Sequence, residues 1–235
     1  MCGPLVEALA YETNNNMLGD MVNAKFWHER WETKNIPFHE SKPNPVLVKY
    51  FGRLSLKKGA RVFVPLCGKT LDIGWLLSKG YRVAGAELSR IAVEELFAEL
   101  GLKPKIEELG KRGVVKISAK NIDVFNGDIF GVTRAALGRI DAIYDRAAMV
   151  ALPEEVRKRY VAHLRKIANG ARELLVTYDY DQEAMDGPPF SISNVEVMER
   201  YGKFYELNLV ASQRVPGGLK GKLPAIENVW MLRLR

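Results

Sequence analysis

The loop at residues 65–70, PLCGKT, is the first stretch with a candidate chemistry, because GKT matches the end of a phosphate-binding loop. The full P-loop pattern also requires a glycine five positions before Gly68, where the sequence has Phe63. The dinucleotide fingerprint is absent as well, since Gly68 is the only glycine between Arg61 and Ile73. A pyrophosphate needs several backbone N–H groups at close approach, so the loop argues against both phosphate-binding patterns.

An acidic residue beyond this loop still points to a nucleoside. Glu87 ends an apolar run about 20 residues further on, where a carboxylate can accept hydrogen bonds from both ribose hydroxyls. A ribose-binding acid without a pyrophosphate cradle suits an adenosine derivative that lacks phosphates, and S-adenosylmethionine is the obvious candidate. Asp128 would then contact the adenine amino group, with Ile129 against the adenine face. The alternative is that Glu87 is a solvated acid at a helix start, stabilised by the helix dipole.

Strand and helix patterns alternate from residue 60 onward, and they place these residues at strand ends. Strands are predicted at 60–66, 81–87, 121–130, 139–145 and 171–180. Helices are predicted at 18–31, 44–51, 70–80, 89–100, 153–170 and 193–202, with Asn44, Ser89 and Ser193 among the N-caps. Segments 203–215 and 226–235 alternate as an antiparallel pair. Repeated strand–helix units predict an α/β fold with a doubly wound, mostly parallel sheet.

The composition is that of an ordinary globular protein: 235 residues, 47% of them hydrophobic, and a formal net charge of +7. Lysines and arginines are scattered among acids, which favours a solvated basic surface over a nucleic-acid-binding one. No apolar run approaches the roughly 18 residues of a membrane span, and the N-terminus lacks a secretory signal pattern. Cys2 and Cys67 cannot form a disulfide framework, so we expect a cytoplasmic protein.

Five motifs, in order along residues 25–235, resemble the thiopurine S-methyltransferase family. They are FWHERW…FH, VPLCGKTLDIGWL, GAELS, YDRAAMVALP and GPPF. The resemblance implies the class I methyltransferase fold, which is Rossmann-like, with a seven-stranded sheet and an antiparallel C-terminal strand. It also implies S-adenosyl-L-methionine as the methyl donor and S-adenosyl-L-homocysteine as the product. Residues 102–120 match the family least well.

The resemblance also implies roles for individual residues. The implied cofactor contacts are Trp31, Leu66, Gly68, Glu87, Asp128 and Arg146. The residues implied at the acceptor are Trp27, Phe38, Pro188, Pro189 and Phe190, the last three in a loop that covers it. Trp27 and Trp31 are four positions apart on one helical face, so both could instead be core anchors. In the functional interpretation, Trp31 closes over the cofactor, where an aromatic face favours the positive sulfonium.

Methyl transfer from a sulfonium to a soft thiolate needs little acid–base help, so positioning and desolvation supply most of the rate. Arg146 is the expected catalytic residue, because a fixed cation lowers the pKa of the acceptor thiol and orients the thiolate. The alternative is an ordinary surface ion pair between Arg146 and Asp145. The three histidines are dispersed and Cys67 lies at a tight turn, so we expect neither a metal site nor a covalent nucleophile.

The sequence therefore predicts an S-adenosylmethionine-dependent S-methyltransferase acting on small aromatic or heterocyclic thiols. Methylation of selenium or tellurium oxyanions is the alternative within this class, and a nucleic-acid-binding or RNA-methylating protein is the alternative from another class. Residues 1–24 are expected to form an N-terminal arm, and residues 25–235 a single methyltransferase domain. We expect a monomer whose partner is a small-molecule acceptor.

Overall fold

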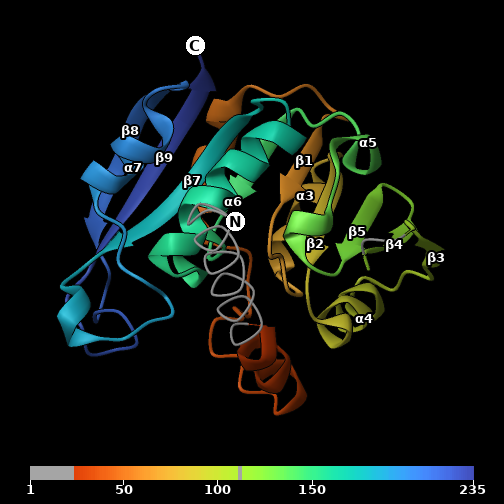
Figure 1. Cartoon of the computed structure of the whole chain (residues 1–235), viewed down its shortest axis with the longest axis horizontal. Helices are drawn as coiled ribbons and strands as arrows, with labels where there is room; N and C mark the ends of the chain where they lie inside the picture. Colours follow the sequence, from red (N-terminus) through yellow and green to blue (C-terminus); the bar gives the residue numbers. More distant parts are fainter. Residues whose placement is uncertain (1–23, 111–112) are drawn as a thin grey trace, which may run out of the picture.

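The computed structural model describes residues 24–110 and 113–235, and its strands form one nine-stranded sheet (Figure 1). The strand order is β3-β4-β5-β2-β1-β6-β7-β9-β8. The strands are β1 (Arg61–Val64), β2 (Arg82–Glu87), β3 (Lys105–Glu108), β4 (Val115–Ala119), β5 (Ile122–Asn126), β6 (Ala142–Asp145), β7 (Arg172–Asp179), β8 (Tyr205–Arg214) and β9 (Ile226–Leu234). Strands β5, β2, β1, β6 and β7 run parallel, whereas β9 is antiparallel to both of its neighbours.

Helices cover both faces of the sheet, as a doubly wound fold requires. They are a helical segment at 24–32, α2 (Pro45–Tyr50), α3 (Leu71–Ser78), α4 (Arg90–Glu99), α5 (Arg134–Leu137), α6 (Glu154–Ile167) and α7 (Asn194–Tyr201). One core packs α6 and α7 against one face, and the other packs α2, α3 and α4 against the opposite face. No helix among the described residues is long and apolar enough to cross a membrane.

Short polar side chains begin several helices where the sequence predicts them. The Asn44 side chain accepts the N–H of Val46 at 2.9 Å, with Pro45 in the first helical position. Ser89 caps α4 through the N–H of Ala92, and Ser193 caps α7 in the same way. The cap at Ser89 fixes where α4 starts after β2, and so it fixes the short loop beyond Glu87.

The predicted strand number is wrong, because the sheet has nine strands and not seven. The two added strands, β3 and β4, form an antiparallel hairpin that extends the sheet beyond β5. They lie in the segment 102–120. Every residue of β3 is exposed, so this edge strand has no buried face and leaves no apolar alternation in the sequence. The seven remaining strands have the predicted arrangement.

The N-terminal prediction is tested only in part. The predicted helix at 18–31 is observed as helical residues 24–32, and its first six positions lie outside the described residues. The predicted arm at 1–24 lies outside them as well, except for its last residue.

Candidate active site

Glu87 ends β2 with only 6% of its surface exposed, so it is not a solvated acid. Its carboxylate accepts the N–H of Gly68 at Oε2 and the N–H of Ser89 at Oε1, both at 2.7 Å. Burial raises the pKa of Glu87, and these two N–H groups partly oppose the shift. A carboxylate has about four acceptor positions, so two remain for a pair of hydroxyl groups.

The loop between β1 and α3 turns through two residues with a left-handed backbone, Leu66 (φ 45°) and Gly68 (φ 51°). A Cβ atom added to Gly68 would lie 3.0 Å from Cζ2 of Trp31. Trp31 is 2% exposed, and its indole packs directly on this loop, where a Cβ atom at position 68 would crowd the ring. Because the N–H of Gly68 donates to Glu87, three of the predicted cofactor residues form one continuous set of contacts.

Trp31 belongs to an aromatic cluster at the end of the helical segment 24–32. Phe38 contacts Trp27 and Trp31 edge-on, with ring centroids 5.6 Å and 5.7 Å apart. Lys34, just after the helix, forms an ion pair with Glu95 of α4. Trp31, predicted at the cofactor, thus lies together with Trp27 and Phe38, predicted at the acceptor, and Trp31 packs on the loop that follows β1.

The residues predicted at the adenine lie at the end of β5. Asp128 is exposed, and its side chain accepts the N–H of Phe130 at 2.9 Å, which caps a short 3-10 turn, η2 (Ile129–Gly131). Ile129 is buried. Asn126, which the sequence analysis missed, donates from Nδ2 to the carbonyl oxygens of Glu87 at 2.9 Å and Leu88 at 3.1 Å. It ties the ends of β5 and β2 together, and so brings the predicted ribose and adenine residues close.

Arg146 follows β6 and forms an ion pair with Glu40, a residue of the segment between the helical residues 24–32 and α2. The side chain of Arg146 is 12% exposed, and its buried Nε has no partner within the described residues. Burial lowers the pKa of Arg146, but the carboxylate of Glu40 and other nearby acids outweigh this and raise it overall. Arg146 is therefore a cation that Glu40 holds in place, and its Nε–H has no partner within the described residues.

The alternative pairing of Arg146 with Asp145 is not observed. Asp145 points into the core, where it accepts the hydroxyl of Tyr160 at 2.7 Å and the N–H of Met149 at 3.0 Å. The same polar cluster includes Glu173 of β7, which accepts the hydroxyl of Tyr201 at 3.2 Å. Asp145 therefore holds the turn after β6, and the guanidinium of Arg146 is directed elsewhere.

The GPPF loop lies against the segment that follows Arg146. The N–H of Phe190 donates to the carbonyl oxygen of Val150 at 2.6 Å. The hydroxyl of Tyr180 donates to the carbonyl oxygen of Pro189 at 2.6 Å, and Pro188 and Pro189 are half-buried. These bonds hold the GPPF loop against residues that follow β6 and β7, and its role as a cover for the acceptor stays a prediction.

The side chains of Cys67, His163 and His28 could suggest a nucleophile or a metal site, but they are buried, hydrogen-bonded to the backbone and exposed, respectively. Cys67 is buried against β2, and burial, together with the charge of Glu87, raises the pKa of its thiol well above the usual range. His163 hydrogen-bonds the carbonyl oxygen of Ile129 at 2.8 Å, and His28 is exposed. Among the described residues, no group of three or more histidine, cysteine, aspartate or glutamate side chains could hold a metal ion.

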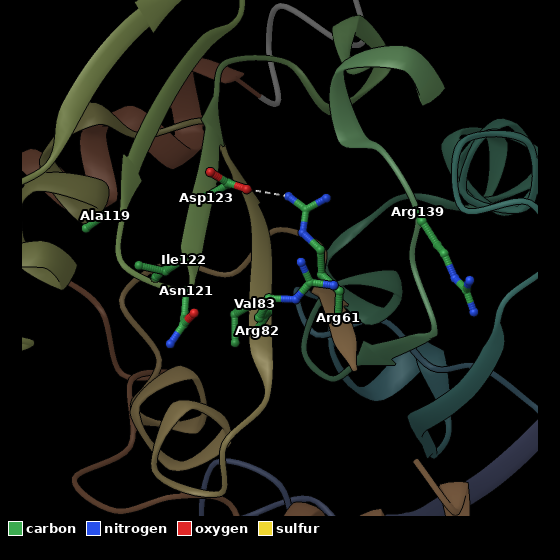
Figure 2. Close-up of a pocket in the computed structure, with 8 residues that line it drawn as sticks. All are labelled: Arg61, Arg82, Val83, Ala119, Asn121, Ile122, Asp123 and Arg139. Carbon is green, nitrogen blue, oxygen red and sulfur yellow. Dashed lines mark hydrogen bonds and ion pairs between the residues drawn. The ribbon is translucent and has the colours of Figure 1, made fainter. Parts of the chain in front are cut away.

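A pocket of about 390 Å³ lies at the opposite end of the parallel strands (Figure 2). Arg61, Arg82 and Ile122 line it at the first residues of β1, β2 and β5. Figure 2 shows the guanidinium of Arg61 directed at Asp123, and the two form an ion pair at 2.5 Å. Glu87 and Arg146 lie at the carboxyl ends of their strands, so this pocket is separate from the predicted site.

The model of the thiopurine S-methyltransferase family matches residues 22–223 of this chain. A thiopurine S-methyltransferase of Xanthobacter autotrophicus is 54% identical over 208 residues, which cover 88% of this chain and 97% of the relative. One from Teredinibacter turnerae is 49% identical over 211 residues, covering 90% and 97%. The chain belongs to the thiopurine S-methyltransferase family. This confirms the predicted family and enzyme class, an S-adenosylmethionine-dependent methyltransferase.

Solved structures agree on the fold of this family member. A 1,6-didemethyltoxoflavin-N1-methyltransferase of Burkholderia thailandensis, crystallised with S-adenosylhomocysteine, aligns with a TM-score of 0.63 at 14% identity, covering 94% of this chain and 90% of the other. An S-adenosylmethionine-dependent methyltransferase of Anabaena variabilis aligns with a TM-score of 0.59 at 14% identity, covering 90% and 95%. The class I methyltransferase fold and its cofactor are therefore confirmed. Glu87, with two acceptor positions left, and Arg146, with an unpartnered buried N–H, fit that cofactor and an acceptor.

Proposed function

We propose that this protein transfers the methyl group of S-adenosylmethionine to the sulfur of small aromatic or heterocyclic thiols. The observation that carries the proposal is that a buried acid suited to ribose, Glu87, and a largely buried cation, Arg146, lie at the carboxyl ends of β2 and β6, on either side of β1. Family membership supports methyl transfer, and the relatives named above are thiopurine S-methyltransferases.

Glu87 binds the two ribose hydroxyls through its free acceptor positions, while Gly68 and Ser89 keep the carboxylate in place. Trp31 covers the cofactor from the side of the loop after β1, and Leu66 and Gly68 shape that loop. Asp128 and Ile129 bind adenine at the end of β5. Bound S-adenosylmethionine supplies an activated methyl group on a positively charged sulfur.

Arg146 acts on the acceptor. Its positive charge favours the thiolate over the thiol, which lowers the pKa of the acceptor and supplies a nucleophile near neutral pH. Trp27 and Phe38 provide aromatic surface for a flat acceptor, and the loop with Pro188, Pro189 and Phe190 excludes water. In this arrangement the protein needs no general base, because orientation and desolvation supply most of the rate.

Two variants test the proposal. Glu87→Gln keeps the side-chain size, but its amide cannot accept both backbone N–H groups and both hydroxyls, so we expect S-adenosylhomocysteine affinity to fall at least about tenfold. The matched control is Glu107→Gln, which removes a carboxylate from the exposed strand β3 and leaves affinity unchanged. Calorimetric titration with S-adenosylhomocysteine provides the measurement. Unchanged affinity in Glu87→Gln would contradict the assigned role of Glu87.

Arg146→Met tests the acceptor side. We expect it to reduce turnover of an aromatic thiol by about two orders of magnitude, because a preorganised charge at the reacting anion is lost. The loss should shrink as pH rises above the pKa of the free thiol, since the thiolate then forms without help. A loss that is equally large at every pH would contradict the role of Arg146 in thiol ionisation.

A further inference from the structure

The acidic partner of Arg146 is a feature that the proposed function does not use. Glu40 lies 106 positions away in the sequence and reaches Arg146 from the segment before α2. Its side chain is 39% exposed, whereas that of Arg146 is 12% exposed. Glu40 also lines a surface hollow of about 430 Å³, together with residues 39, 41–43 and 45. The carboxylate of Glu40 is therefore partly open to solvent, whereas the guanidinium of Arg146 is largely buried.

A chain of hydrogen bonds, part-buried at Glu40 and buried at Asp72, holds Glu40 in place. Asn44 donates from Nδ2 to both carboxylate oxygens of Glu40, at 3.3 Å and 3.2 Å. The backbone N–H of Asn44 donates to Asp72 at 2.7 Å, and Asn44 itself is 4% exposed. Asp72 also accepts the hydroxyl of Tyr144 at 3.1 Å, and Tyr144 lies on β6, two residues before Arg146. The Glu40–Arg146 pair is thus built into the fold on both sides, unlike a typical surface ion pair.

The guanidinium of Arg146 is a binding site for anions, and in this structure the carboxylate of Glu40 binds it. Glu40 takes the outer end of Arg146, while the buried Nε has no partner within the described residues. Glu40 holds Nη2 of Arg146, so an anionic ligand that binds this nitrogen must displace Glu40. A second carboxylate, Glu227, accepts the hydroxyl of nearby Tyr178 at 3.3 Å, and the pKa of Tyr178 is raised to about 12, mainly by burial. The acidic side chains of Glu40 and Asp72 interact directly with the charge of Arg146 and offset part of it.

We propose that Glu40 is a specificity-determining residue, an internal anion that an acceptor must displace from Arg146. Small inorganic anions such as phosphate bring no further contacts, so they do not compete with Glu40 for the cation. A flat aromatic thiolate gains additional contact with Trp27 and Phe38, which compensates for the loss of the Glu40–Arg146 pair. Glu40 thereby makes Arg146 selective for anions that also carry an aromatic ring. This inference rests on the proposed function of Arg146.

The test is Glu40→Gln, with Glu40→Ala as a second variant and Glu107→Gln as the matched control. Turnover of 6-mercaptopurine is measured as S-adenosylhomocysteine formation, with and without sodium phosphate. Without the internal anion, we expect the KM for the thiol to fall about five- to tenfold with little change in kcat, as for loss of a competitor worth about 1 kcal/mol. Phosphate should inhibit both Glu40 variants and leave the parent protein and the control unaffected.

Calorimetric titration with phosphate, without an acceptor, separates this inference from the proposed function. Tighter phosphate binding by both Glu40 variants supports the inference even if no thiol is methylated, an outcome that would instead contradict the proposed function. Unchanged KM and phosphate binding in both variants would overturn the inference. So would tighter binding of S-adenosylhomocysteine with unchanged KM, because Glu40 would then compete with the cofactor carboxylate. Melting temperatures of all variants show whether a change in KM reflects altered folding.

Discussion

Two buried carboxyl groups, Asp145 and Glu173, lie on the core face of neighbouring strands. Asp145 is opposite Leu175 and Glu173 is opposite Ile143 in the parallel register, so the two acids are diagonal neighbours on one face. Their relative exposures are 0% and 1%, and within the described part of the chain neither forms an ion pair. Each acid accepts a hydrogen bond from a phenolic hydroxyl, Asp145 from Tyr160 and Glu173 from Tyr201. Two acids this close and this buried carry one negative charge more readily than two.

Burial raises the pKa of both groups, to about 6 for Asp145 and well above the usual value for Glu173, where the charge of Asp145 adds to the shift. An acid whose pKa is higher in the folded protein contributes stability below its unfolded pKa, and that stability is lost as pH rises through the folded pKa. For Asp145, the change from 3.8 to about 6 corresponds to about 3 kcal/mol, at roughly 1.4 kcal/mol per pKa unit. The folded protein should therefore lose stability between about pH 4 and pH 7 through this pair.

Glu173→Gln removes one charge and keeps an oxygen that can accept the hydroxyl of Tyr201. We expect this variant to be more stable than the parent by about 1–3 kcal/mol at pH 8, and by much less at pH 4.5, where the parent pair is protonated. At pH 8 the melting temperature should rise by about 2–4 °C for each kcal/mol. The assay is urea unfolding followed by tryptophan fluorescence at several pH values, with Glu107→Gln as the control. A variant that is equally destabilised at both pH values would refute this reasoning, since Glu173 would then be a stabilising carboxylate.

Two further changes probe the loop after β1 and the packing of α6. Gly68→Ala adds a Cβ atom 3.0 Å from Trp31 at a left-handed position, so S-adenosylhomocysteine affinity should fall at least about tenfold and stability by about 1–2 kcal/mol. Gly52→Ala, whose Cβ atom would meet open space, is its control, and equal affinities would contradict the packing of Trp31 on the loop. Arg157→Met removes a buried guanidinium that contacts Glu196 at 2.6 Å and 2.8 Å, so urea unfolding should show a loss of about 3 kcal/mol. A loss below about 0.5 kcal/mol, as expected for an exposed residue such as Arg233, would contradict this contribution.

Local signals in the sequence were sufficient for most of the fold. Helix starts at Asn44, Ser89 and Ser193 were predictable because an N-cap acts within three residues of the backbone N–H group that it binds. The parallel strands were predictable because both of their faces are buried, which produces continuous apolar runs. The exposed strand β3 was missed because a strand with no buried face needs no apolar residues and so has no apolar pattern.

Part of the site depends on contacts that no local pattern contains. Glu87 could be found because its spacing from the loop after β1 is fixed by one strand–helix–strand unit. Glu40 could not, because its partner Arg146 is 106 positions away and the contact forms only when the segment before α2 reaches β6. Asn126 was missed for a similar reason. An asparagine at a strand end is common, and only the structure places it on the carbonyl oxygens of Glu87 and Leu88.

The most direct test of the central claim is S-adenosylhomocysteine formation by the purified protein with a panel of acceptors. The panel contains an aromatic thiol, 6-mercaptopurine, the oxygen analogue hypoxanthine, selenite and RNA. Our account predicts turnover of the two thiols and none of hypoxanthine or RNA, because Arg146 favours a soft anion and the site closes over a small flat molecule. Methylation of RNA, or equal turnover of the oxygen and sulfur analogues, would contradict it.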